Sequence, residues 1–191
     1  MKKKYTVIIM FIIVLILIIF ISKNMFKKSK FGNNMDSQEI VDQILNINSY
    51  IAEIEVQVNS NKNQNKYKIK QEYNTENGCM QEVIEPLNIA GVKITNKDNI
   101  LTIENSELSL KNIYENYEEL ENNNLDLHVF LKEFKDDENS NFEEKDEEIV
   151  MHCRTKNLYI KKDNLKPEKL IIKGNNQNQE IIIKYINIEL N

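Results

Sequence analysis

The sequence predicts an α+β protein in which helices cover the concave face of a curved antiparallel β-sheet, a half-barrel, behind one N-terminal transmembrane helix. Three observations lead to this prediction. Tyr5–Ile21 is a continuous apolar run that contains no charge, Gly or Pro. From Tyr50 onward, apolar residues recur with a period of two in one short segment after another, as in strands with one solvated face. Helical spacing appears only before Tyr50 and after Asn112, which leaves helices available to cover one face of the sheet.

The apolar run Tyr5–Ile21 predicts a membrane anchor. At about 1.5 Å per residue it just crosses a hydrocarbon core of about 30 Å. A cleaved signal peptide is the rival interpretation, since Lys2, Lys3 and Lys4 supply its basic start. The run is longer than such a peptide needs, no small-x-small cleavage site follows it, and no Cys follows for lipid attachment. We therefore expect residues 1–22 to be an uncleaved signal anchor.

Residues 23–35 form a basic and polar linker, and residues 36–191 have the size of one ordinary domain. Lysines lie on both sides of the apolar run, so the positive-inside rule does not decide the orientation. The linker lysines are suited to contacting anionic lipid headgroups, or they are ordinary flanking charge.

The first elements of the domain are a helix and a hairpin. Asp36 is placed to cap a helix that runs to Ile47, and Glu39 follows three residues later as in a capping box. The period then changes, and Tyr50–Val58 and Tyr67–Tyr73 predict two antiparallel strands around a polar loop.

Further strands and a helical insertion follow. Asn112–Phe134 returns to helical spacing and is broken by Asn122–Asn124, which predicts two short helices, and Asp136–Glu148 predicts an acidic loop. A meander of roughly eight to ten strands is expected to curl, because large twisted sheets seldom stay flat. The remaining expected strands are Cys79–Glu85, Ile89–Thr95, Ile100–Glu104, Leu108–Leu110, Ile149–Arg154, Leu158–Lys162, Lys169–Lys173 and Glu180–Glu189.

Composition and motifs argue against several functions. The net charge of −5, with many lysines near the anchor, leaves an acidic domain that is unsuited to binding nucleic acid. The sequence has four Gly and no Gly-rich phosphate loop, and no Ser lies in a nucleophile elbow. These features favour a binding protein over an enzyme and predict no cofactor.

The residues that commonly bind metals are scattered. His152 and Cys153 are adjacent in a predicted strand and so point to opposite faces, while His128 and Cys79 lie far away in the sequence. We expect structural histidines, no metal and two free cysteines, although a disulfide between Cys79 and Cys153 is compatible with the sequence. The calcium-loop spacing of Asp137, Asn139, Asn141 and Glu148 lacks the required central Gly, since Phe142 stands there.

Several short stretches form a recognisable series in the order Glu82–Pro86, Ile89–Val92, Ile103–Asn105 with Leu108 and Leu110, Tyr114–Tyr117 and Leu158–Ile160. Taken in this order, they resemble a LolA/LppX-like half-barrel family of spore-forming bacteria, which includes the germination lipoprotein GerS. The resemblance covers about residues 36–191 and implies a domain outside the cytoplasmic membrane. In GerS the implied role is that of a non-catalytic partner of a cell-wall amidase that prepares spore-cortex peptidoglycan, whereas more distant Lol relatives carry lipid in the concave face. This chain departs from the family in having an anchor where a lipoprotein Cys is expected.

The leading hypothesis is a single-pass protein of the cytoplasmic membrane, N-terminus inside and domain outside, that docks a cell-wall amidase or another envelope protein in sporulation or germination. The alternative is a lipid or lipoprotein carrier, and an enzyme ranks third. The lining of the concave face discriminates the first two, because a carrier needs an open apolar cavity. Four residues of the insertion are the candidates for plugging that face: Leu127, Phe130, Leu131 and Phe134.

Overall fold

The computed structural model describes residues 36–60, 62–116, 125–174 and 179–191, all of which belong to one compact unit, Asn34–Asn191. The expected anchor at Tyr5–Ile21 and the linker 23–35 lie outside the described residues. Within the described residues, no helix has both the length and the apolar character needed to cross a membrane.

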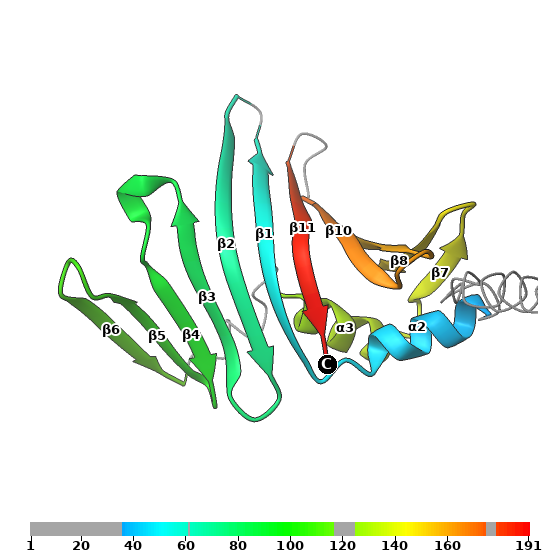
Figure 1. Ribbon diagram of the computed structural model, residues 1–191, viewed down its shortest axis with the longest axis horizontal. Coiled ribbons are helices and arrows are strands. Elements are labelled where there is room, and N and C mark those ends of the chain that lie inside the picture. The colour runs from blue at the N-terminus through cyan, green and yellow to red at the C-terminus, as the bar shows by residue number, and fades with distance from the viewer. Residues whose placement is uncertain (1–35, 61, 117–124, 175–178) are drawn as a thin grey trace, which may run out of the picture. The chain divides into compact units, whose positions relative to one another are not determined.

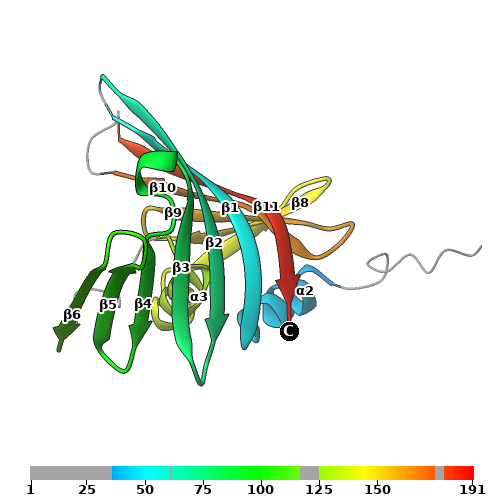
Figure 2. The same ribbon diagram turned by 60° about the vertical axis from the view of Figure 1, so that its left-hand side comes forward.

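The domain is built on one sheet of eleven antiparallel strands (Figure 1). The strands lie in the order β6-β5-β4-β3-β2-β1-β11-β10-β9-β8-β7, so the first and last strands pair at the centre and β6 and β7 form the two edges. The sheet is strongly twisted and curved (Figure 2). The strands are β1 Ser49–Asn59, β2 Gln64–Asn74, β3 Gly78–Glu85, β4 Lys93–Lys97, β5 Ile100–Asn105, β6 Leu110–Glu115, β7 Asn141–Glu144, β8 Glu148–Cys153, β9 Lys156–Lys161, β10 Lys166–Lys173 and β11 Glu180–Leu190.

Alternation along each central strand directs one set of side chains to the concave face. In β1, Tyr50, Ala52, Ile54 and Val56 are all buried. The pairing register carries this inward set across the sheet, because each inward residue faces an inward residue of the next strand.

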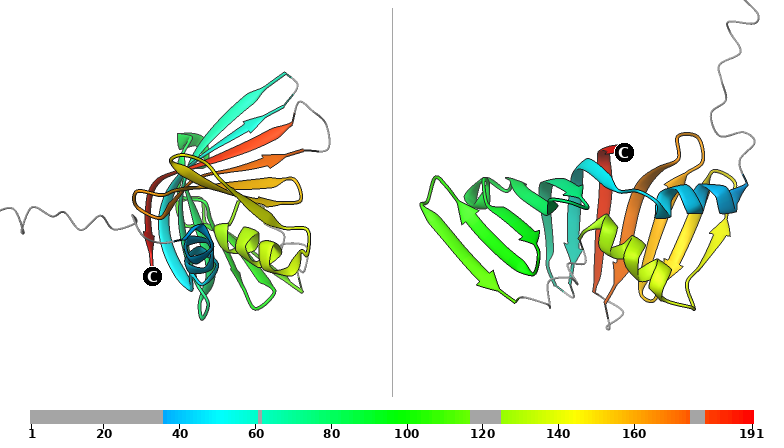
Figure 3. Two further views of the ribbon diagram at one scale, coloured as in Figure 1. Left: turned by 90° about the vertical axis from the view of Figure 1, so that its right-hand side faces the viewer. Right: turned by 90° about the horizontal axis from the view of Figure 1, so that it is seen from below.

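Two helices cover part of the concave face, α2 (Ser37–Leu45) and α3 (Leu127–Asp136). They lie beneath the central strands and the β7–β10 side, while β4–β6 extend beyond them (Figure 3). Helix α2 buries Ile40, Val41 and Ile44 in a core shared with α3 and the strands. The expected curved antiparallel sheet with helices on its concave face is confirmed.

Several local expectations were wrong. Ile89–Thr95 is not one strand, because a 3₁₀ turn, Leu87–Ile89, and the left-handed Gly91 precede β4. The insertion does not begin with a helix, since residues up to Glu115 form β6 through pairing with β5; pairing outweighs a helical spacing that rested on few residues. Its expected break at Asn122–Asn124 lies outside the described residues.

Two polar segments also differ from expectation. The predicted acidic loop contains the short edge strand β7. Its side chains are mostly polar, so the sequence lacks the alternation of apolar and polar residues that would have indicated a strand. Asp36 does stand at the N-cap of α2, but its side chain makes no capping hydrogen bond. The hydroxyl of Ser37 instead donates to Glu144 of β7, which ties the start of the helix to the sheet edge.

Candidate functional site

The four predicted plug residues lie on α3. Leu127, Phe130 and Leu131 are buried in the core, and Phe134 is partly buried with its ring centroid 6.0 Å from that of Phe130. Aromatic and aliphatic side chains thus occupy the space under the central strands. The role of these four residues in excluding a ligand stays a prediction.

A polar cluster lies where α3 begins. The buried carboxylate of Asp126 accepts three hydrogen bonds at one oxygen, Oδ1: from Gln81 Nε2 at 2.6 Å, Cys79 Sγ at 3.0 Å and Gln71 Nε2 at 3.1 Å. The Gln71 amide also donates to the Leu125 carbonyl at 2.9 Å. One carboxylate therefore joins the start of α3 to the concave face of β2 and β3.

The strand register explains why these side chains converge. Gln71 pairs with Gln81, and Tyr73 pairs with Cys79 on one side and Tyr50 on the other. All five residues occupy inward positions. The register therefore places their polar groups side by side on a concave face that is otherwise apolar.

Asp126 stands at the N-cap of α3 yet its carboxylate makes no capping hydrogen bond. The hydroxyl oxygen of Tyr50 accepts from the Leu127 backbone N–H at 3.2 Å and so satisfies one free donor of the helix end. This arrangement leaves the Asp126 carboxylate available to the strands, close to the positive end of the helix dipole.

Burial raises the pKa of Asp126 to about 6, although its hydrogen bonds from Cys79 and Gln81 act in the opposite direction. The carboxylate is therefore charged at neutral pH. Burial, together with the Asp126 charge, also raises the pKa of the Cys79 thiol. None of the ion pairs among the described residues joins a Lys or Arg to Asp126, so hydrogen bonds and the nearby positive end of the helix dipole offset this negative charge.

His128 completes the cluster from the first turn of α3. Its ring stacks on Tyr73 with centroids 4.1 Å apart and planes within 4°. Burial lowers the pKa of His128 and the nearby Lys132 adds to this effect, which brings the pKa to about 4. The imidazole is thus neutral at physiological pH, which is the form that binds metals.

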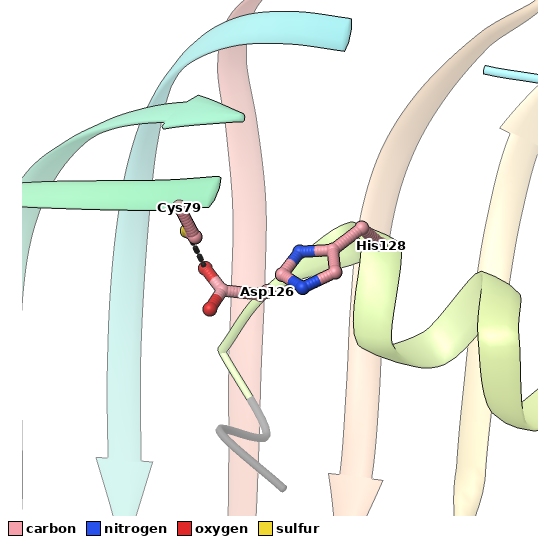
Figure 4. Close-up of side chains that lie close together, drawn as sticks. All are labelled: Cys79, Asp126 and His128. Carbon is pink, nitrogen blue, oxygen red and sulfur yellow. Dashed lines mark hydrogen bonds between the residues drawn. The ribbon is translucent and has the colours of Figure 1, made fainter. Parts of the chain in front are cut away.

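Cys79, Asp126 and His128 point toward one another (Figure 4). A thiol sulfur, a carboxylate oxygen and an imidazole nitrogen lie within 4.8 Å of one another. Cys79 and His128 also line a groove of about 490 Å³ whose wall includes Tyr73, Asn96 and Lys132. This trio is the one group of its kind among the described ranges.

Around this cluster, three buried polar atoms have no hydrogen-bond partner within the part of the chain that the structure describes: Gln71 Oε1, His128 Nδ1 and the Tyr185 hydroxyl. Gln71 is fully buried, and Tyr185 is nearly so. Burial raises the pKa of Tyr185, and the negative charge of Asp126 adds to this effect. The Tyr185 hydroxyl therefore lies near the same cluster. Buried polar atoms without partners commonly mark the place of a bound water or ion.

The second distinctive surface is the sheet edge at β6, which we define as Leu108–Glu115 and call the β6 edge. All six residues of β6 are exposed, and Leu108, Leu110 and Ile113 each expose more than half of their surface. The opposite edge strand, β7, is shorter and carries Glu143 and Glu144, both paired with lysines. Among the described residues, the β6 edge thus combines an open strand with exposed apolar side chains.

Sequence reasoning treated Cys79 and His128 as unrelated structural residues and did not single out Asp126. The fold brings all three together, whereas His152 bonds Asn157 and Cys153 lies in the apolar core. Both cysteines are free and buried. The available signal was the pair of glutamines, Gln71 and Gln81, at inward positions of strands that otherwise bury apolar residues.

The chain matches the family described as "Sporulation protein YdcC-like" over residues 2–191. No curated protein matches the sequence. The family match agrees with the expected resemblance to proteins of spore-forming bacteria.

Solved structures share the fold. An uncharacterized conserved protein from Thermus thermophilus aligns with 10% identity and a TM-score of 0.50, over 82% of this chain and 88% of the other. A second match is a chain in the structure of the CwlD amidase from Clostridioides difficile in complex with the GerS lipoprotein. It aligns with 20% identity and a TM-score of 0.50, over 82% of this chain and 97% of that chain. A LolA superfamily protein from Nitrosomonas europaea aligns less well, with 11% identity and a TM-score of 0.46, over 82% of this chain and 94% of that chain. At these identities the likeness concerns the fold.

Proposed function

The chain belongs to the YdcC-like family of sporulation proteins, and on that basis we propose that it is a non-catalytic binding protein that docks a cell-wall amidase during sporulation or germination. The observation that carries this proposal is the β6 edge, an open strand flanked by exposed apolar side chains. A complex of the CwlD amidase with the GerS lipoprotein, in which one chain has this fold, supports the class of partner.

The β6 edge suits a protein partner for two physical reasons. An edge strand presents unpaired backbone donors and acceptors, which a strand of another protein can pair with. Leu108, Leu110 and Ile113 lie beside those groups, so an interface there buries apolar surface as well. Leu110 and Ile113 point to opposite faces of β6, and a partner that adds a strand contacts both.

The concave face argues for docking over lipid carriage. Leu127, Phe130 and Leu131 are each at most 4% exposed and belong to the core, which supports the proposal that they occupy the space beneath the central strands that a lipid tail needs. The groove beside Cys79 has a largely polar wall that includes Glu76, Asn96 and Lys97, which suits an acyl chain poorly. Native mass spectrometry of the purified full chain is expected to find no bound lipid.

The proposal places the domain outside the cytoplasmic membrane. Residues 1–22 act as an anchor with the N-terminus in the cytoplasm, and residues 23–35 connect it to the domain. Support comes from the apolar run Tyr5–Ile21 and from the resemblance to exported proteins. Protease added to intact protoplasts is expected to digest the domain; a domain that stays protected until the membrane is lysed contradicts this orientation.

Co-purification tests the partner. The tagged full chain, cross-linked in sporulating cells and solubilised in detergent, is expected to retain a cell-wall amidase. The matched sample carries Leu110→Glu and Ile113→Glu, which place charges on the β6 edge without changing the core, and it should lose the amidase. Repeated recovery of no cell-wall hydrolase with the unaltered chain contradicts the proposal.

A further inference from the structure

We propose that Cys79, Asp126 and His128 bind a divalent cation with a preference for nitrogen and sulfur ligands, of which Zn²⁺ is the natural candidate. The site joins β3 to the start of α3. It is independent of the proposed partner, so the two can fail separately.

The donor set selects the class of metal. Thiolate sulfur and imidazole nitrogen favour Zn²⁺, whereas Ca²⁺ and Mg²⁺ prefer oxygen ligands throughout. The three ligand atoms lie within 4.8 Å of one another. Tetrahedral Zn²⁺ holds its ligands at about 2.0–2.3 Å, so side-chain rotation of modest size brings these three onto one ion.

The charge balance also favours a cation. Asp126 is a buried carboxylate that no Lys or Arg pairs with in the ion pairs of the described residues. A divalent ion supplies the missing positive charge. Binding requires Cys79 to lose its thiol proton, which passes to solvent, so the bound thiolate and carboxylate together offset the charge of the ion.

The surroundings resemble the supporting shell of a metal site. Gln71 and Gln81 donate to Asp126 and fix its orientation, and Tyr73 stacks on His128 and fixes the plane of its ring. The unpartnered atoms Gln71 Oε1, His128 Nδ1 and Tyr185 Oη, all in described residues, lie in or beside the same cluster. Gln71 is fully buried and Tyr185 is 8% exposed, so solvent does not satisfy them.

The groove provides an entry path and a place for a fourth ligand. Cys79 and His128 both line it. Three protein ligands and one position open to water or to a partner's side chain complete a tetrahedral shell. With the ion in place, β3 and α3 are joined by coordination bonds, and the stability of the protein rises with the logarithm of the free ion concentration above the dissociation constant.

The chain contains its own matched controls, because it has two cysteines and two histidines. The full chain is purified in detergent with reduced thiols, stripped with a chelator and titrated with Zn²⁺ alone. Metal content, the Zn²⁺-dependent rise in Tm and, with Co²⁺, the thiolate-to-metal charge-transfer absorption are measured. The test variants are Cys79→Ser, Asp126→Asn and His128→Gln, and the controls are Cys153→Ser and His152→Gln.

The expected result is uptake of one Zn²⁺ per chain, weakened at least about tenfold in each test variant and unchanged in both controls. Cys79→Ser should abolish the Co²⁺ charge-transfer band, while Cys153→Ser keeps it. Circular dichroism of the stripped variants separates loss of the site from loss of the fold, and Gln81→Leu, which leaves every ligand in place, should weaken binding about 10–100-fold. No uptake by the unaltered chain, which leaves buried water as the occupant, overturns the proposal, as does uptake that depends on Cys153 or His152.

Discussion

Gln81 of β3 donates a hydrogen bond of 2.6 Å to the carboxylate of Asp126 at the start of α3. This contact joins the helix that fills the concavity to β3, the strand next to those that extend beyond the helices (Figure 3). Hydrogen bonds to a buried charge contribute about 1.5–3 kcal/mol.

Gln81→Leu should therefore lower the free energy of unfolding by about 2 kcal/mol, because a buried carboxylate loses its shortest hydrogen bond. Urea unfolding of the full chain measures the change. Gln57→Leu is the matched control, since Gln57 bonds Asn59 in a half-exposed setting. Equal losses in the two variants contradict a special role for the Asp126 contact.

The stability of the metal-free protein should depend on pH through Asp126. Its folded pKa of about 6 lies above the value of about 3.9 in an unfolded chain. Between these values the folded state holds a proton that the unfolded state has released, so the free energy of unfolding falls as pH rises from about 4 to about 6. The total loss is about 3 kcal/mol.

Urea unfolding of the chelator-treated full chain, at several pH values between about 4 and 6, measures how the free energy of unfolding depends on pH. In Asp126→Asn the group that titrates is gone, so the slope should flatten. A variant that keeps the slope of the unaltered chain shows that another group causes it.

Lys156 of β9 and Glu133 of α3 form an ion pair of 2.6 Å with both side chains largely buried. Glu133→Gln should cost about 3 kcal/mol, because it leaves a buried ammonium group without its partner. The double variant Lys156→Met with Glu133→Leu should recover most of that loss, since an apolar pair of similar size needs no charge compensation. Thermal unfolding is the measurement, and Glu53→Gln, in the exposed pair with Lys68, is the control that should leave Tm unchanged.

Gly78 at the start of β3 has a positive φ of 77°, and a Cβ there would lie 2.2 Å from the carbonyl oxygen of Asn96. Gly91 has a similar φ of 79°, but the nearest atom to a Cβ there is Asn105 Nδ2 at 4.0 Å, an ordinary contact distance. Gly91→Ala should cost about 1 kcal/mol from the backbone conformation alone, whereas Gly78→Ala should cost more, about 2–3 kcal/mol, because β4 must also shift. Equal losses in unfolding experiments contradict the close contact.

Much of the fold could be predicted because the central strands alternate cleanly. In β1 the apolar residues occupy every second position, so the sequence identifies which face of the strand is buried: Tyr50, Ala52, Ile54 and Val56. The β6 edge could not be predicted in this way. Its residues are all exposed, so they leave no alternation to read, and pairing with β5 decides their conformation.

The polar cluster was beyond sequence reasoning for a different reason. Cys79, Asp126 and His128 come from β3 and from the start of α3, and only the pairing register and the position of α3 bring them together. The burial of Leu127, Phe130 and Leu131 was easier to predict, because these residues share one face at helical spacing.

The central claim is that the β6 edge docks a cell-wall amidase. The direct test is the affinity of the detergent-solubilised full chain for the sporulation amidase of the same organism, measured for the unaltered chain, for Ile113→Glu and for Ile186→Glu. Ile113 and Ile186 are both 56% exposed, but Ile186 lies on β11, at the centre of the sheet. The prediction is tight binding that Ile113→Glu weakens at least about tenfold, a loss of about 1.4 kcal/mol, and that Ile186→Glu leaves unchanged. No binding by the unaltered chain, or equal weakening by both substitutions, contradicts the claim.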